Sequence, residues 1–450
     1  MPTFHEAQLR HAIHYSHIAT DASNSYLQGG EASQSGLLLF DQERVQIDIG
    51  WGWSQDQPAS TPLDELLLAY ADAMAYIGDL RYNRQRQRIP QLQTAIAAAR
   101  RLERKQAEVS LLKGLGSVYF ALGDYRGAIA LYQQQLKIAR EIGDQQHESS
   151  ALRRLGVSYT ALGETHSALQ YHQDSLTIAR QIGDRRGEGS ALGALGLAYQ
   201  ALGDLNRAVE FYEEQLQLAR QLGLWQAESQ VLNLIGTALV EKGEYQRAIA
   251  NLARGLTIAR QINDRQNEGN ACGGLGLAYQ ALGELEYAID YYHQRLVVVR
   301  ELDDRRGEGF CLGRMGTAYA MRGMFAEAET ALTAAQHIFV TVASRSGQGH
   351  VAVCTANCYR EQGRFIEAQQ LYEQAMTIFA AIEERDRLAE CAFEFARMLR
   401  RKGVETAAQE QAQRALELYE ECGADALVAQ VQAWRDGRGL PLNQKRGQDE

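Results

Sequence analysis

A glycine that recurs at intervals of 40 residues is the feature that most constrains this 450-residue chain. It occupies eight successive positions with no step missed: Gly123, Gly163, Gly203, Gly243, Gly283, Gly323, Gly363 and Gly403. A fixed period of this length is typical of repeat proteins, in which each unit buries its apolar surface only against its neighbours. We therefore expect a solenoid built from one repeated unit rather than a set of ordinary globular domains.

Two further columns of small residues keep the same register. An alanine follows each loop glycine by five residues, at Ala128, Ala168, Ala208, Ala248, Ala288, Ala328, Ala368 and Ala408. A glycine or alanine precedes it by seven, at Gly116, Gly156, Gly196, Gly236, Gly276, Gly316, Ala356 and Ala396. Small residues at these points let two helices approach closely, and the loop glycine is suited to end the first helix in a left-handed conformation. Each unit therefore predicts a helix A, a turn and a helix B, for example over 186–202 and 205–221.

Charged residues mark where each helix A begins. Asp184 and Asp264 are good N-caps, and a glutamate in the following turn suits the helix dipole. The Arg-Arg-Gly-Glu segments at 185–188 and 305–308 open two of these helices. We expect them to form a salt-bridge ladder between repeats; the alternative is contact with an acidic partner, and such surface pairs contribute little each.

The segment LGLAYQALGDLNRAVEFYEEQLQLARQLG, at 195–223, resembles the tetratricopeptide repeat. Its 40-residue form is similar to the repeat of the spindle-orientation adaptor Pins and its relatives, and of many bacterial proteins. The resemblance covers roughly residues 64–435. It implies an all-α fold, a right-handed superhelical solenoid of about eight to nine helix pairs with capping helices, whose concave groove, lined by helix A, holds peptides or partner segments.

The pattern fades toward both ends of the chain, which divides it into five parts. We expect an N-terminal helical hairpin over 1–60, broken at Gly29-Gly30, and a degenerate first repeat over 61–104, with helices near 63–78 and 92–102. Eight full repeats follow over 105–423. A capping helix over 424–437 would close the core with Trp434, and the polar tail 438–450 is expected to be disordered.

The hairpin carries a second resemblance. The patterns R-H-x-x-H-Y near residue 10 and L-x-x-F-D-x-E-R-x-x-I near residue 38 resemble the helix pair that precedes the repeat sensor in signal-transduction ATPases with numerous domains (STAND proteins). The chain departs from those proteins because the phosphate-loop pattern G-x-x-x-x-G-K-[ST] is found nowhere in it. The resemblance therefore implies a sensor half without its ATPase.

Composition excludes several classes of function. A net charge of −10 argues against general nucleic-acid binding, which needs a positive face. No apolar run approaches the roughly 20 residues that cross a bilayer, so no membrane insertion is expected. The first residues lack the apolar core of a secretory signal, and a cytoplasmic location is the default expectation.

No catalytic, cofactor or metal signature is found. Cys354 and Cys358 stand four residues apart without a second thiol pair, so small buried core residues are the favoured interpretation. His11, His14 and His17 lie three apart on one expected helix, but no fourth ligand is evident. Glycine-rich runs such as 187–196 lie inside helix A rather than after a strand. We therefore expect no enzyme activity, no cofactor and no metal.

The outward positions of helix A should line the groove. In a unit numbered so that Gly116 is position 8, positions 2, 5, 9 and 12 share one side at 100° per residue. They mix hydroxyl, amide, apolar and charged groups, which suits a bound peptide segment. The candidate binding residues are Ser110, Lys113, Ser117, Phe120, Ser150, Arg153, Thr160, Ser190, Gln200, Gln230, Asn233, Thr237, Asn270 and Gln280.

Two features refine this groove. Lys113 and Arg153 make its first part positive, so an acidic partner residue is expected there. The small residues Gly193, Ala194, Gly273 and Gly274 are expected to leave room for a bulky segment to approach the backbone.

The favoured function is a protein-interaction scaffold that holds a partner segment in this groove. The alternative is the sensor of a STAND-like bacterial signalling system that docks to a separate ATPase or effector. Self-association through the 1–60 hairpin is a further expectation.

Overall fold

A computed structural model describes residues 3–437, and the tail at 438–450, expected to be disordered, lies outside the described residues. Residues 3–437 form α-helices and one π-helical turn, with no strand among them. The chain divides into two compact units, one ending at Ala191 and the other beginning at Leu192, so that the division falls inside helix α10. Nothing in the repeat pattern marks this point.

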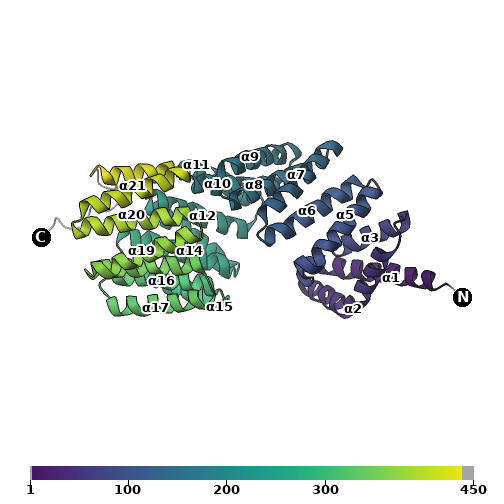
Figure 1. Cartoon of the computed structure of the whole chain (residues 1–450), viewed down its shortest axis with the longest axis horizontal. Helices are drawn as coiled ribbons and strands as arrows, with labels where there is room; N and C mark the ends of the chain where they lie inside the picture. Colours follow the sequence, from purple (N-terminus) through teal and green to yellow (C-terminus); the bar gives the residue numbers. More distant parts are fainter. Residues whose placement is uncertain (1–2, 438–450) are drawn as a thin grey trace. The chain divides into compact units, whose positions relative to one another are not determined.

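The first unit contains the N-terminal hairpin and the first repeats (Figure 1). Its elements are α1 (Phe4–Leu27), α2 (Gly30–Asp56), α3 (Thr61–Ala73), α4 (Ile77–Arg81), the π-helical turn η1 (Arg84–Arg88), α5 (Ile89–Arg101), α6 (Lys105–Ala121), α7 (Tyr125–Ile142), α8 (Gln145–Ala161), α9 (Thr165–Ile182) and the start of α10 (Arg185–Ala201). The hairpin turns at Gly29, whose φ of 84° is left-handed.

The second unit contains the later repeats and the C-terminal helix. Its elements are the rest of α10, then α11 (Leu205–Gln221), α12 (Trp225–Lys242), α13 (Tyr245–Gln261), α14 (Arg265–Leu282), α15 (Leu285–Glu301), α16 (Arg305–Met321), α17 (Phe325–Thr341), α18 (Arg345–Glu361), α19 (Phe365–Ala381), α20 (Arg385–Lys402), α21 (Glu405–Glu421) and α22 (Asp425–Arg435). Even-numbered helices from α6 to α20 are the A helices of the repeats, and each is followed by its helix B.

The repeat glycines act as the sequence predicts. All eight loop glycines have φ between 77° and 86°, in the left-handed region. The column at Gly116 serves close packing: a Cβ added there would lie less than 3.0 Å from the ring of Tyr132 on helix B. Gly196 and Gly276 meet Tyr212 and Tyr292 in the same way.

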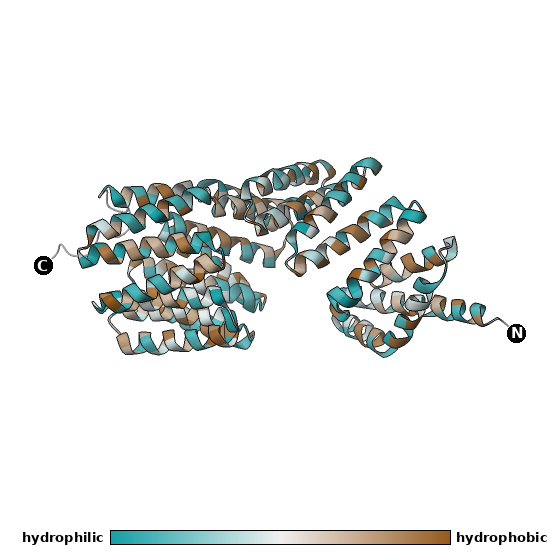
Figure 2. Cartoon of the chain, in the orientation of Figure 1, coloured by the Kyte–Doolittle hydropathy of each residue, from teal (hydrophilic) through white to brown (hydrophobic). Residues whose placement is uncertain are grey.

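The helices are amphipathic, and their apolar faces form buried clusters within each unit. Figure 2 shows hydrophilic and hydrophobic residues alternating along the helices rather than whole helices of one kind. In the first unit one cluster joins hairpin residues such as Phe40 and Trp51 to Tyr70 and Met74 of the following segment. The Tyr70 hydroxyl donates to the carbonyl of Ala12 at 2.7 Å. The hairpin is therefore packed into the first unit through a shared core.

The segment 61–104 differs from the expected pair of helices. The first helix ends at Ala73 rather than near 78, and α4 and η1 lie between it and α5. This path is held by Arg88, whose side chain is 2% exposed and whose Nε donates to Asp79 at 2.6 Å. A buried arginine of this kind needs a carboxylate partner, and the repeat pattern contains no signal for it.

The predicted ladder of ion pairs is present in both units. In six consecutive B-type helices, from α5 to α15, an arginine near the end donates through Nε to a glutamate eight residues later, in the next helix A, at 2.5–2.9 Å. The pairs are Arg100–Glu108, Arg140–Glu148, Arg180–Glu188, Arg220–Glu228, Arg260–Glu268 and Arg300–Glu308. Arg185 and Arg305 add a second contact to Glu188 and Glu308. Asp184 and Asp264 cap their helices as expected, accepting from the backbone three residues later.

Candidate binding site on the helix A face

The first unit places its candidate residues on the outward sides of α6, α8 and α10. Ser110, Thr160 and Ser190 are exposed, and Ser150 is half-buried. Phe120 is half-buried with its ring 5.1 Å from that of Tyr125. The hydroxyls of Thr160 and Ser190 donate to carbonyls of their own helices.

Three basic residues on α6 and α8 gather on this face, and we call them the cationic cluster: Lys113, Arg153 and Arg154. All three are half-buried. Burial, followed by the nearby charges of Arg154 and Arg153, lowers the pKa of Lys113. Burial and then Arg154 lower the pKa of Arg153. Like charges are thus held close together in a partly desolvated place.

The surroundings of this cluster do not neutralise it. Arg154 donates to the hydroxyl of Ser117 at 2.8 Å and lies over the ring of Tyr132, but its Nε is buried without a partner. In the described part of the chain, no carboxylate comes within ion-pair distance of the three cations, and the charge of Asp184 only partly opposes the lowering of the pKa of Arg153. His172 lies behind them with 1% exposure, and burial, then Arg153, lowers its pKa to about 4. A neutral imidazole adds no charge, so the cluster keeps a positive charge that Asp184 offsets only in part.

Some candidate residues of the second unit are exposed, whereas others are half-buried or buried. Gln230 and Asn270 are exposed, while Gln200, Thr237 and Gln280 are half-buried. Asn233 is different: its side chain is 5% exposed, and its Nδ2 donates to the carbonyl of Asn267 at 3.0 Å. The structure therefore corrects the expected outward position of Asn233, because its amide links one helix A to the next.

The expected free space over the small residues is absent. A Cβ at Gly193 would meet the amide of Gln215, and one at Gly273 would meet the guanidinium of Arg295. Both covering side chains come from the helix B that follows in the sequence. The glycines therefore make room for these long side chains, and the backbone there is not open to a ligand.

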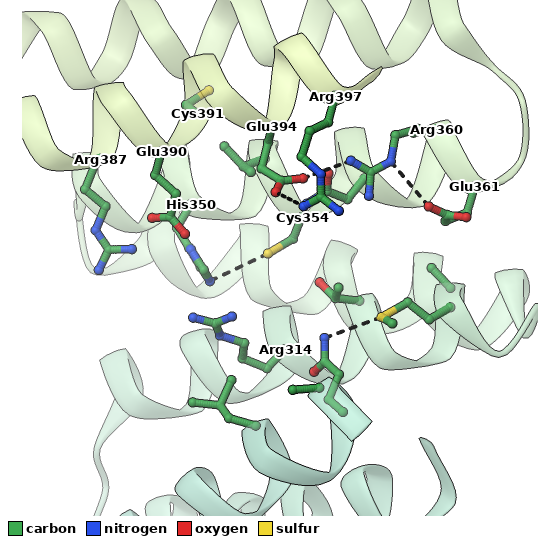
Figure 3. Close-up of a pocket in the computed structure, with 18 of the residues that line it drawn as sticks. Arg314, His350, Cys354, Arg360, Glu361, Arg387, Glu390, Cys391, Glu394 and Arg397 are labelled. Atoms are coloured by element: carbon green, nitrogen blue, oxygen red, sulfur yellow. Dashed lines mark hydrogen bonds and ion pairs between the residues drawn. The ribbon is translucent and has the colours of Figure 1, made fainter. Parts of the chain in front are cut away.

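The helix A side of the second unit contains a cavity of about 560 Å³. Side chains from α12, α14, α16, α18 and α20 line it, together with Phe379 of α19 (Figure 3). Of the candidate residues, Gln280 lies in this lining. A cavity of this size matches sites for small ligands or a few peptide residues.

Most charged groups in this cavity are paired. Glu394 accepts from Arg360 at 2.9 Å and from Arg397 at 2.6 Å. Burial opposes ionisation of Glu394, but these two arginines hold the pKa of the carboxyl below its ordinary value. Arg360 also contacts Glu361, which in turn accepts from Arg401. Figure 3 shows the part of this network that lines the cavity, formed by Arg360, Glu361, Glu394 and Arg397.

The other residues of this cavity were not among the sequence candidates, which come from the first five repeats. The later repeats contribute polar residues at positions 2, 9 and 12: His350, Thr317, Asn357, Arg360 and Arg397. Arg314, Cys354 and Glu394 occupy position 6. The signal that could have found them is this column, because small or apolar residues in the middle repeats give way there to polar ones in the last three.

The cysteines and histidines considered as metal ligands make contacts within the protein. Cys354 and Cys358 are 5% and 0% exposed, and burial raises the pKa of both thiols. His11 contacts Gln46 through Nε2 at 2.9 Å. Among residues 3–437, no group of three side chains is arranged to hold a metal, and no helix is long and apolar enough to span a bilayer.

Comparison with known proteins agrees with the repeat architecture. Two tetratricopeptide repeat family models match, one at residues 89–181, 187–261 and 350–421, the other at 271–306. No curated protein matches the sequence.

Three solved structures share the fold at low sequence identity. The apo form of the quorum sensor NprR from B. thuringiensis is 15% identical, with a TM-score of 0.54 over 80% of this chain and 97% of that one. The apo form of RapI is 15% identical, with a TM-score of 0.53 over 62% of this chain and 99% of that one. A STAND protein with a tetratricopeptide repeat sensor, from Pyrococcus horikoshii, is 12% identical, with a TM-score of 0.53 over 95% of this chain and 65% of that one.

The family matches cover more than half of the chain, and the helix pairs, loop glycines and small-residue columns have the form that these matches require. The protein belongs to the tetratricopeptide repeat family.

Proposed function

We propose that this protein is a non-catalytic interaction module of a cytoplasmic, bacterial signalling system, and that the helix A face of its first unit binds an acidic segment of a partner protein. The cationic cluster carries the proposal. Lys113, Arg153 and Arg154 are half-buried, the charges of the two arginines lower the pKa of Lys113, and none of the three cations has an ion pair within the described residues. Such an arrangement costs free energy in the unbound protein, and an acidic segment would relieve it.

The neighbouring candidates suit the rest of such a segment. Ser110, Ser150 and Thr160 offer hydroxyl groups, and Phe120 offers an aromatic surface on the same side of α6 and α8. Backbone amides and carbonyls of an extended peptide can bond to the hydroxyls, while its apolar side chains pack between them. The acidic side chain would supply specificity through the cationic cluster.

A defined acidic probe tests the proposal. Binding of a fluorescein-labelled hexaglutamate peptide is measured by anisotropy for the wild type and for Lys113→Glu/Arg153→Glu. We expect at least about tenfold weaker binding in the double variant and a loss of affinity with added salt, because two attractive charges become repulsive. The matched control is Arg126→Glu/Lys137→Glu, which makes the same charge change at exposed positions of helix α7. Equal weakening in both double variants would show that only net charge matters, and would reject the site.

The same variants identify the natural partner. Each protein is immobilised and exposed to lysate of its host, and bound proteins are identified by mass spectrometry. A partner that the wild type and the control retain, and that Lys113→Glu/Arg153→Glu loses, is the expected result. Identical capture by all three proteins would remove the partner site from this face.

The sensor of a STAND-like system is the second candidate, because the hairpin α1–α2 is the part that resembles those proteins. The hairpin shares its core with Tyr70 and Met74, so deleting it would expose that core. Substitution of its exposed apolar residues is therefore the better test. Capture of an ATPase that is lost in Leu38→Ser/Val45→Ser, but kept in the cationic-cluster variant, would favour the sensor.

A further inference from the structure

The cavity of the second unit contains charged groups that its internal network does not satisfy. Arg314 on α16 and Arg387 on α20 line it, and neither has an ion pair or hydrogen bond within the described residues. Glu390 also lines the cavity without a partner of this kind. Arginines that enter a cavity are normally paired, because the guanidinium has five donors to satisfy. These two are therefore available to a ligand.

The two arginines converge on one side chain. Figure 3 shows Arg314 and Arg387, from different helices, with their guanidinium groups near the ring of His350 on α18. Burial, then the charges of Arg314 and Arg387, lowers the pKa of His350 to about 3. The Nε2 of His350 lies 3.6 Å from the sulfur of Cys354, whose thiol pKa is raised by burial. His350 and Cys354 are thus neutral at physiological pH, and the positive charge at this point comes from the arginines alone.

The charge balance indicates what the cavity would bind. Arg360, Arg397, Glu394 and Glu361 are paired with carboxylate or guanidinium partners, which leaves two unpaired positive charges and the one negative charge of Glu390. A single negative charge restores neutrality, whereas a phosphate dianion would add a second charge beside Glu390. Arginine forks also match the two oxygens of a carboxylate.

The cavity also has apolar lining residues. Leu277 and Leu282 of α14 and Met321 of α16 line it, with Val240 contributed by α12. Methionine adapts to irregular ligand shapes, and apolar walls with a few fixed polar groups are typical of sites for small ligands. A ligand that uses both kinds of lining residue therefore needs a charged group and an apolar part.

We propose that this cavity binds a small amphipathic monocarboxylate, with the carboxylate between Arg314 and Arg387 and the apolar part against Leu277 and Met321. The carboxylate can be the free C-terminus of a short apolar peptide or the head of a small carboxylic acid. This site is separate from the cationic cluster of the first unit, and its residues take no part in binding the acidic segment.

Calorimetric titration of the full chain with defined probes tests the proposal. The probes are N-acetyl-trileucine with a free carboxyl group, the same peptide as its amide, octanoate, octanol and octyl phosphate. We expect at least one of the two carboxylates to bind about tenfold or more tightly than its uncharged counterpart, and octyl phosphate to bind more weakly than octanoate. The tighter of the two carboxylates identifies the source. The proposal would be overturned if neither carboxylate bound. It would also be overturned if the peptide amide bound as tightly as the peptide acid and octanol bound as tightly as octanoate.

Point variants place the carboxylate. Arg314→Gln and Arg387→Gln should each weaken carboxylate binding about tenfold, and Glu390→Gln should strengthen it by removing a repulsive charge. The control is Arg345→Gln, an exposed residue at the start of α18 that lies outside the cavity and should leave binding unchanged. Unchanged binding in Arg314→Gln/Arg387→Gln would refute the assignment.

The melting temperature of the ligand-free variants separates binding from folding. Both arginine variants should melt at or above the wild-type temperature, because each loses an unpaired charge rather than an ion pair. A clear drop would mean that the arginines serve the fold, and would count against the proposal. Binding of hexaglutamate at the cationic cluster should stay as in the wild type, so this inference and the proposed function fail separately.

Discussion

At the scale of single residues, His172 stands out because it places an imidazole in a buried column that holds tyrosine, leucine or alanine in the other repeats. The corresponding position holds Tyr132, Tyr212, Tyr292 and Tyr372 in other repeats, each packed in the core. The His172 ring packs against Gly156 as Tyr132 packs against Gly116. Burial lowers the pKa of His172 to about 4, whereas a histidine in the unfolded chain titrates near 6.5.

This shift predicts a pH dependence of stability to which His172 contributes one part and the buried His350, whose pKa is lowered to about 3, contributes another. Between about pH 6.5 and 4 the unfolded chain binds the proton and the folded chain does not, so stability falls as the pH falls, by at most about 1.4 kcal/mol per pH unit. His172→Tyr places at this position the residue found in four other repeats and should make that part of the profile less steep, while the contribution of His350 remains. Urea unfolding from pH 7.5 to 4.5 measures it. A profile that keeps its full slope in His172→Tyr would assign the acid sensitivity to other groups.

The ladder glutamates are also single residues with a measurable role. Glu228 is 8% exposed at its side chain and accepts from Arg220 at 2.9 Å and from Arg254 at 3.0 Å. Glu228→Gln removes the charge and should lower the free energy of unfolding by about 1–2 kcal/mol. The effect is no larger because both arginines are partly exposed to solvent, which screens the pair. Glu213→Gln is the control, since its pair with Arg247 is long and exposed. Chemical denaturation that finds the two variants equal would show that the ladder adds no stability.

At the scale of helices, the close approach of helix A to helix B depends on single glycines. In α6, a Cβ at Gly116 would lie less than 3.0 Å from the buried ring of Tyr132, whereas one at Gly114 would meet only Leu92 at 3.7 Å. Alanine favours a helix interior over glycine by about 1 kcal/mol. The two positions therefore separate helix propensity from packing within one element.

We expect opposite effects from the same substitution at these two positions. Gly114→Ala should raise the free energy of unfolding by up to about 1 kcal/mol, and Gly116→Ala should lower it by about 1–2 kcal/mol because the tyrosine ring must move. Thermal and chemical unfolding of the two variants measure the difference. Stabilisation by both substitutions would show that the helix pair can separate at little cost.

At this scale the sequence predicted most of the fold. Helix A and helix B, expected over 186–202 and 205–221, lie at Arg185–Ala201 and Leu205–Gln221. Such local features follow from residues that contact their own repeat. The path of 61–104 was not predictable, because it depends on the burial of Arg88 with Asp79 rather than on periodicity. The cavity around Arg314 and Arg387 was also missed, since it requires side chains from helices about two repeats apart to meet.

At the scale of the whole molecule, the outer face of the hairpin is the surface whose use remains to be measured. Leu38, Val45 and Ile49 lie at spacings of seven and four on α2 and are 59%, 67% and 52% exposed. These spacings place them on one stripe of the helix. Other large apolar residues of the hairpin, such as Phe40 and Trp51, are buried in the core of the first unit. The stripe therefore contributes little to the fold, and self-association is the use that the sequence predicts for it.

This expectation leads to a prediction about oligomeric state. The wild-type protein should show a concentration-dependent shift from monomer toward dimer in light scattering coupled to size-exclusion chromatography, because pairing would cover the stripe. Leu38→Ser/Val45→Ser should remain monomeric with an unchanged melting temperature, since both side chains are already in solvent. Gln42→Ser, on the same face but not apolar, should behave as the wild type does. A wild-type protein that stays monomeric at every concentration would rule out the dimer. The stripe would then be available to a different partner, and the capture of an ATPase from the host lysate would be the next experiment.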